Sequence, residues 1–347
     1  MRKKVTLVVM VATILGASLN QIVAKDNVVV LRSGRKSNIV GDIEKMSKKG
    51  LAIAVGRNSQ KIAVHQIFRI SYSNEPSELR SARNAILGGQ LEQGIESLKQ
   101  IDTSKVSANV RQDVDYFVIF AKAKLALRGE RDLIGTAREA TAFLKTHPQS
   151  IHYYEAVELI GDIAMALGKY PTAVKTYSQI TKSSFKEFEL KGALLEARAL
   201  QLDSKYEEAQ SKYDVVLDSG LNDTHSLHEK KLATIGKAAC LVETGSVEPA
   251  IETLQKMIAD NDPKDSKLFA QAYNALGSAY QKSGKTVDAV LAYLHVDVLF
   301  YNERDAHAES LFHLSKLWNQ LNKPDRAVKA RQTLSERYNG TVWAKRS

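Results

Sequence analysis

Three hydrophobic patterns divide the chain. An uncharged apolar run extends from Val5 to Leu15, and from Asn27 to Tyr72 apolar residues alternate with polar or small ones. From Ser77 onward apolar side chains recur at positions i, i+3 and i+4. Alternation with a period of two is typical of strands, and the longer spacing is typical of amphipathic helices. The chain is therefore predicted to be mostly α-helical, with a small β module near its beginning.

The first apolar run has the features of a targeting signal. Arg2, Lys3 and Lys4 precede it, and the small residue Ala24 follows it just before Lys25. A basic start, a short apolar stretch and a small residue at a cleavage site are typical of a secretory signal peptide. The run is shorter than the roughly 20 residues that span a bilayer. We therefore expect residues 1–24 to be a removable signal and the mature chain to be exported to the periplasm or cell envelope; an uncleaved N-terminal anchor remains the alternative.

The alternating segment, residues 25–73, predicts five short strands separated by turns rich in Gly, Asn and Ser. Short strands at this spacing indicate a small antiparallel β-barrel. The positions of Val30, Gly34, Gly41, Gly50 and Ile53 resemble those of Sm-like and SH3-like barrels. The loops lack the Asp/Asn pair that Sm proteins place around a base, so no nucleic-acid partner is expected.

A repeat runs through residues 74–347. Its clearest copy extends from Ala272 to Tyr280 and continues with Gly284, Ala289 and Tyr293. A small residue recurs at intervals of 36 to 43 residues, at Gly94, Ala137, Ala173, Ala209, Ala250, Ala289 and Ala327. These residues resemble the tetratricopeptide repeat (TPR). The resemblance implies an α-solenoid of about seven helical hairpins, with the first helix of each hairpin, the A helix, on a concave face that binds proteins or peptides.

The small residues of the repeat have a direct physical purpose. Gly161 and Gly277 on the predicted A helices, with Ala173 and Ala289 on the predicted second helices, the B helices, let the two helices of a hairpin approach closely. A large side chain four residues after the B-helix marker, such as Tyr177, then fills the adjoining groove. Each hairpin leaves one apolar face uncovered, so neighbouring hairpins must stack to bury it.

Charge is distributed unevenly. The formal net charge is +10 and the isoelectric point about 9.4. Residues 1–24 carry three basic side chains and no acidic one, residues 25–80 carry eleven against five, and the remaining chain is nearly neutral. The basic residues of the β module cluster at turns, where a solvated surface is the usual explanation. Contact with an anionic polymer or a membrane surface is the alternative.

The chain carries no convincing enzyme motif. Ala279 to Thr286 fits a relaxed phosphate-binding loop, but no strand precedes it, as such a loop requires. His225 and His228 with Glu229 form at best a weak metal-binding pattern, and the single cysteine, Cys240, lies in an apolar run that predicts burial. We therefore expect no catalytic site, no cofactor and no metal.

Function is expected at the concave face. If the repeat register holds, ten A-helix residues face it: Glu155, Glu158, Asp162, Lys191, Arg198, Gln271, Asn274, Ser278, Gln281 and Lys282. A simply solvated face is the alternative for these residues. The prediction is a non-enzymatic interaction scaffold of the bacterial envelope that binds a peptide or a partner protein. The second hypothesis is an envelope adaptor whose basic β module binds an anionic polymer or membrane surface.

Overall fold

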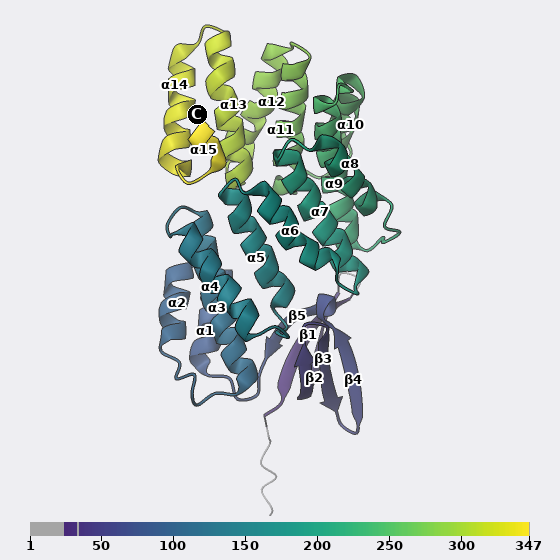
Figure 1. Ribbon diagram of the computed structural model, residues 1–347, viewed down its shortest axis with the longest axis vertical. Coiled ribbons are helices and arrows are strands. Elements are labelled where there is room, and N and C mark those ends of the chain that lie inside the picture. The colour runs from purple at the N-terminus through teal and green to yellow at the C-terminus, as the bar shows by residue number, and fades with distance from the viewer. Residues whose placement is uncertain (1–23, 33–34, 347) are drawn as a thin grey trace, which may run out of the picture.

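The computed structural model describes residues 24–32 and 35–346 (Figure 1). All but the last residue of the predicted signal peptide lies outside these ranges, so its cleavage stays a prediction. Among the described residues, no helix combines the length and the apolar character needed to cross a membrane.

The N-terminal module is a small antiparallel sheet of five strands. The strands are β1 (Asp26–Arg32), β2 (Arg35–Ser47), β3 (Gly50–Val55), β4 (Asn58–Ala63) and β5 (Ile67–Ser71). They pair in the order β4-β3-β2-β1-β5, and a single 3-10 turn, Val64–Gln66, leads into β5. The predicted strands are therefore confirmed. Closure into a barrel is not, because β4 and β5 are the two edges of the sheet in the described residues.

The rest of the chain forms seven helical hairpins and a short final helix, as the repeat predicts. The helices are α1 (Ser77–Leu87), α2 (Leu91–Lys99), α3 (Ala108–Leu127), α4 (Leu133–Thr146), α5 (Tyr153–Ala166), α6 (Tyr170–Thr181), α7 (Lys186–Leu202), α8 (Tyr206–Leu217), α9 (Thr224–Glu243), α10 (Val247–Ala259), α11 (Ser266–Lys282), α12 (Thr286–Leu299), α13 (Arg304–Gln320), α14 (Pro324–Tyr338) and α15 (Val342–Arg346). Odd-numbered helices from α1 to α13 are the A helices, and the helices that follow them are the B helices.

The predicted marker residues lie on the B helices, and all but one are buried. The exception is Ala137, which is half-buried, whereas its neighbour Thr136 is buried. Ala173 is the fourth residue of α6, and the fourth residue of α4 is Thr136. The repeat marker in this hairpin was therefore placed one residue too late, because a threonine takes the position of the usual alanine.

Glycines on A helices receive tyrosine rings from B helices. A Cβ atom added at Gly161 would lie 2.2 Å from Cε1 of Tyr177, which is 1% exposed. The same relation joins Gly277 to Tyr293, and Gly236 on α9 receives the ring of Tyr213 from α8 of the preceding hairpin. The ring thus occupies space that any larger residue would fill, and this confirms the packing expected from the sequence.

The A helices define one face of the array. α3 packs on α5, α7 on α9, α9 on α11 and α11 on α13, whereas the B helices make their main contacts with A helices. This arrangement places the A helices on the inner side of the superhelix. We call their exposed surface the inner face; Glu158, Lys191, Arg198 and Gln281 lie on it.

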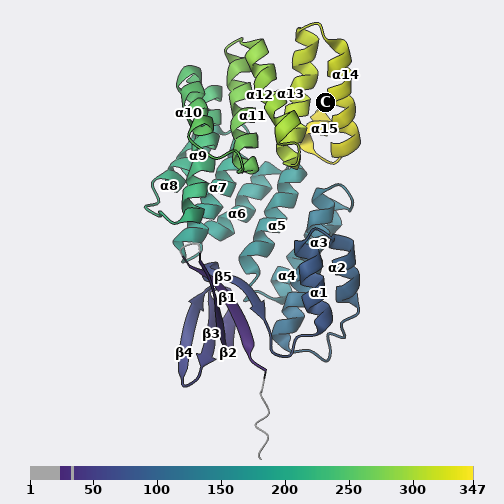
Figure 2. The same cartoon turned by 180° about the vertical axis from the view of Figure 1, so that it is seen from behind.

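The array returns on itself, so that its last hairpin lies beside the turns of early ones (Figures 1 and 2). Arg304 at the start of α13 donates a hydrogen bond of 2.7 Å to the main-chain carbonyl of Arg128, which follows α3. Arg346 on α15 lies 3.4 Å from the Tyr170 hydroxyl at the start of α6. These two polar contacts join the last hairpin to the residue after α3 and to the start of α6.

The sheet and the first helices share one hydrophobic core. Val28 and Ile53 of the sheet belong to the same buried cluster as Leu79 on α1 and Val110 on α3. The Tyr72 hydroxyl, just after β5, donates to Asp113 on α3 at 3.1 Å. The β module is therefore packed against the first hairpins, and this brings β5 close to the beginning of the inner face.

Candidate functional site

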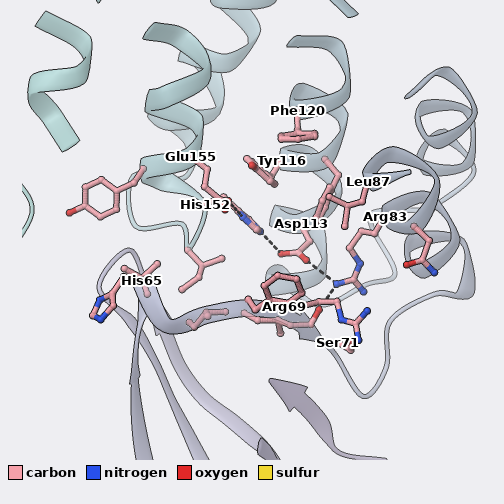
Figure 3. Close-up of a pocket in the computed structure, with 18 of the residues that line it drawn as sticks. His65, Arg69, Ser71, Arg83, Leu87, Asp113, Tyr116, Phe120, His152 and Glu155 are labelled. Atoms are coloured by element: carbon pink, nitrogen blue, oxygen red, sulfur yellow. Dashed lines mark hydrogen bonds and ion pairs between the residues drawn. The ribbon is translucent and has the colours of Figure 1, made fainter. Parts of the chain in front are cut away.

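A cavity of about 680 Å³ lies where β5 meets α1, α3, α5 and α7 (Figure 3). We call it the junction pocket, defined by Phe68, Arg69, Leu87, Phe117, Glu155 and Phe188. Its wall also includes Lys191, so the pocket contains two of the residues predicted for the concave face. The pocket is thus the end of the inner face that adjoins the sheet.

The deep side of the pocket is a network of paired charges. The buried Arg83 on α1 forms an ion pair with Glu75 and donates to the main-chain carbonyl of Ile70 on β5. Its guanidinium also lies 3.6 Å from the buried carboxylate of Asp113. Every one of these buried charges is therefore partnered, which makes the network a structural element that fixes β5 against α1 and α3.

His152, just before α5, extends this network toward the inner face. Its Nε2 lies 3.0 Å from Asp113 and its Nδ1 lies 2.7 Å from Glu155 (Figure 3). Burial alone would lower the pKa of His152, but the two carboxylates raise it to about 9. The Tyr116 ring stacks on the imidazole with ring centres 3.9 Å apart. At neutral pH His152 is therefore a fixed cation held between two acids.

The rim of the pocket is apolar and exposed. Phe68 on β5 is 53% exposed and Leu87 at the end of α1 is 66% exposed. The ammonium group of Lys36 lies 3.5 Å from the centre of the Phe68 ring. Arg69, the next residue on β5, is exposed and forms no ion pair within the described ranges. The mouth thus combines large apolar side chains with a free guanidinium.

Acidic and basic side chains alternate along the inner face beyond the pocket. Glu158 on α5 and Lys191 on α7 form an ion pair of 2.5 Å. Burial opposes the charge of Lys191, but Glu158 raises its pKa above the ordinary value. Asp162, one turn further, accepts a hydrogen bond of 2.8 Å from Tyr177. Its pKa is raised by burial and by the charge of Glu158.

The middle of the array combines a buried carboxyl group with exposed cations. Glu229 on α9 is 4% exposed, and its Oε2 has no hydrogen-bond partner among the described residues. Burial raises its pKa to about 8, although the charge of Lys191 opposes the shift. Arg198 on α7 and Lys267 on α11 are exposed and form no ion pair in the described part of the chain.

The far end of the inner face is tied together by side chains of α9, α11 and α13. Lys282 pairs with Glu243 at 3.0 Å. Asn274 is buried, and its amide nitrogen donates to the Ala306 carbonyl at 2.8 Å and to Glu309 at 3.1 Å. The pKa of Glu309 is raised to about 7 by burial, against the opposing charge of Arg198. Asn274 therefore joins two A helices, and its Oδ1 is left without a partner within the described ranges.

The structure brings the predicted residues together in two groups. Glu155, Glu158, Asp162 and Lys191 adjoin the junction pocket. The second group lies on α11: Gln271, Asn274, Ser278, Gln281 and Lys282. Arg198 lies between the two groups, close enough to Asp305 and Glu309 of α13 for their charges to act on it. The residues that β5 and α1 contribute to the pocket were not predicted. Their only signal was the adjacent apolar pair Ile67 and Phe68, because two neighbouring apolar residues cannot both lie on the buried face of a strand.

The weaker chemical patterns have structural explanations. His225 lies 3.4 Å from Glu229, and His228 lies 2.9 Å from Asp265, the residue that caps the start of α11. Among residues 24–32 and 35–346, no group of three or more His, Cys, Asp or Glu side chains could hold a metal ion. Burial raises the pKa of Cys240 to about 12, so its thiol stays protonated.

The phosphate-loop pattern also has a structural explanation. Residues 279–282 are the last of α11, and Gly284 has a positive φ of 75° in the turn to α12.

Comparisons with known proteins point to the fold. No protein-family model matches the sequence, and no curated protein does. A tetratricopeptide repeat protein from Parabacteroides merdae superposes with a TM-score of 0.56 at 14% identity, covering 77% of this chain and 96% of the other. The Rap protein complexed with Competence and Sporulation Factor gives 0.55 at 12% identity, covering 77% and 76%. NprR in complex with its cognate peptide NprX gives 0.50 at 14%, covering 76% and 79%. The chain thus has the fold of a TPR-like helical solenoid, preceded by a small antiparallel sheet.

Proposed function

We propose that the protein is a non-enzymatic scaffold of the bacterial cell envelope that binds an extended peptide or a partner protein on its inner face. One observation carries the proposal. The inner face presents two exposed cations, Arg198 and Lys267, that form no ion pair among the described residues. Unpaired cations on neighbouring A helices are typical of a surface that meets complementary charge on a partner.

An extended peptide suits these groups better than a small molecule does. Its main chain supplies a donor and an acceptor at every residue, and its side chains can meet charges spaced along successive A helices. Among the proteins of similar fold, NprR is solved with a cognate peptide and Rap with Competence and Sporulation Factor. These relationships support a peptide or protein as the ligand class.

Export and the domain limits belong to the same proposal. The basic and apolar residues before Lys25 support a signal over residues 1–24, and the change of pattern supports a β module over 25–73 and a repeat array over 74–347. The sheet order β4-β3-β2-β1-β5 supports an SH3-like arrangement of the module.

Site-specific photo-crosslinking tests the proposal. A photoreactive amino acid replaces Gln281, which is exposed on the A helix α11, and in a matched variant it replaces Leu291, which is 52% exposed on the B helix α12. We expect irradiation of cells to give a discrete adduct from position 281 and little from position 291. Equal adduct yields at the two positions, or none at either, would contradict the proposal.

A second function has its own observation. Lys45, Lys49, Arg57 and Lys61 of the β module form no ion pair in the described residues, so the module has an uncompensated positive charge. Vesicles of phosphatidylglycerol and phosphatidylethanolamine provide the test. Binding that is strong at low salt and lost at high salt would favour the anionic-surface adaptor.

A further inference from the structure

The junction pocket has a different chemistry from the rest of the inner face. Phe117, Phe120, Tyr154 and Phe188 contribute to its wall, and the exposed Phe68 stands on its rim. Its volume of about 680 Å³ lies within the range of about 300–1,000 Å³ in which proteins hold ligands. Large apolar side chains left exposed together on one concave surface are typical of an interaction site.

One wall of the pocket is an edge strand. Among the described residues β5 pairs only with β1, and the residues from Ile67 to Ser71 all line the cavity. A bulge in the β1–β5 ladder leaves Phe68 without a partner residue on β1. Arg83 donates a hydrogen bond to the carbonyl of Ile70, so its ion-pair network holds the C-terminal end of β5. The segment from Ile67 to Arg69 lies open toward the cavity. An extended chain can lie along such an edge.

The side chains around the pocket carry a positive charge that favours an acidic group on the ligand. Arg69, Arg80 and Lys191 line it together with a single unburied acid, Glu155, which is itself held by His152. Arg80 pairs with Glu75 and Lys191 pairs with Glu158, whereas Arg69 has no acidic partner in the described residues. A bound carboxylate beside Arg69 would supply the missing counter-charge.

We propose that the junction pocket anchors an extended segment of the partner protein, with a large apolar side chain inserted between Phe68 and Leu87 and an adjacent Asp or Glu paired with Arg69. The pocket shares Glu155 and Lys191 with the inner face, so the same partner chain can continue along the A helices. This inference rests on the proposed function, and it adds where the segment is anchored and which side chains it carries.

The test uses a phage-displayed library of random peptides and the mature chain, residues 25–347. Peptides are selected on the wild-type protein and measured by fluorescence anisotropy against three variants. The first combines Phe68→Ala with Leu87→Ala, the second is Arg69→Glu, and the control combines Val298→Ala with Leu299→Ala on α12, where both side chains are 62% exposed. All five positions are exposed, so the fold is expected to persist, and circular dichroism verifies it.

We expect the selected peptides to pair an aromatic or large aliphatic residue with a neighbouring Asp or Glu. Each pocket variant should weaken their binding at least tenfold, and the α12 control should leave it unchanged. A Gln281→Trp variant, which places a bulky side chain on the inner face, distinguishes binding along the inner face from anchoring in the junction pocket. Peptides that are sensitive to Gln281→Trp but not to the pocket variants would overturn the anchor and leave the inner-face function standing.

Three further outcomes would also overturn the anchor. One is a selection that yields no peptide binding wild type more tightly than the pocket variants. Another is the enrichment of peptides without acidic residues. The third is binding of phosphatidylglycerol vesicles that the Phe68→Ala/Leu87→Ala variant abolishes without any peptide being selected, since this would assign the pocket to an anionic amphiphile.

Discussion

The packing of Tyr177 against Gly161 leads to the sharpest stability prediction. In an isolated helix, alanine is more stable than glycine by about 1 kcal/mol, so Gly161→Ala would stabilise α5 if the site were open. The new Cβ would instead lie 2.2 Å from Cε1 and 2.6 Å from Cζ of the tyrosine ring. The ring cannot move aside freely, because it is 1% exposed and its hydroxyl is bonded to Asp162.

Overpacking of this kind costs about 1–3 kcal/mol, and we expect Gly161→Ala to lower the free energy of unfolding by about 2 kcal/mol. Urea unfolding followed by circular dichroism measures the change. Gly135→Ala is the comparison, because there the nearest atom, at 2.6 Å, is an oxygen of the exposed Asp132 carboxylate that caps α4, and disturbing this cap should cost only about 1 kcal/mol. In a Gly161→Ala/Tyr177→Leu double variant the two costs should be less than additive. A neutral or stabilising Gly161→Ala would refute the packing argument.

Three further predictions concern charge and closure. Glu229 has a folded pKa of about 8, above its unfolded value, so the free energy of unfolding should fall as pH rises from about 4.5 to 8. Glu229→Gln should remove up to about 5 kcal/mol of that fall in urea titrations at a series of pH values. His152 has a folded pKa of about 9, above its unfolded value of about 6.5, so it adds up to about 3 kcal/mol to the free energy of unfolding. This stabilisation is complete below pH 6.5 and is lost as pH rises through 9, and His152→Gln should abolish the loss. Arg304→Ala removes the hydrogen bond to Arg128, and small-angle X-ray scattering should show a larger radius of gyration than that of wild type.

The sequence was a good guide to the repeat because the signal is local. A small residue on one helix and a tyrosine on the other, as at Gly277 and Tyr293, must recur wherever a hairpin closes in this way. The same reasoning failed at Ala137. Thr136 is small enough to take the buried position, so the packing is kept although the sequence departs from the repeat motif.

The junction pocket could not be predicted, because it depends on contacts between segments far apart in the chain. Phe68 and Leu87 are close in sequence, but the wall opposite them comes from Phe117 and Phe188, and only the docking of the sheet on α1 and α3 brings the four together. The prediction that Asn274 faces a ligand was based on helical periodicity alone. Asn274 is buried because α13, the next A helix, packs over α11. The periodicity of a single helix gives no information about such a contact.

The central claim is that a partner segment lies along the inner face. The most direct test is hydrogen–deuterium exchange of the protein, measured with and without the bound segment. The partner segment that crosslinks at position 281 is made as a synthetic peptide and added to residues 25–347, and the change in exchange is mapped by mass spectrometry. The account predicts slower exchange in A helices α5, α7, α9 and α11 and unchanged exchange in B helices α8, α10 and α12. Slower exchange confined to the B helices would contradict it.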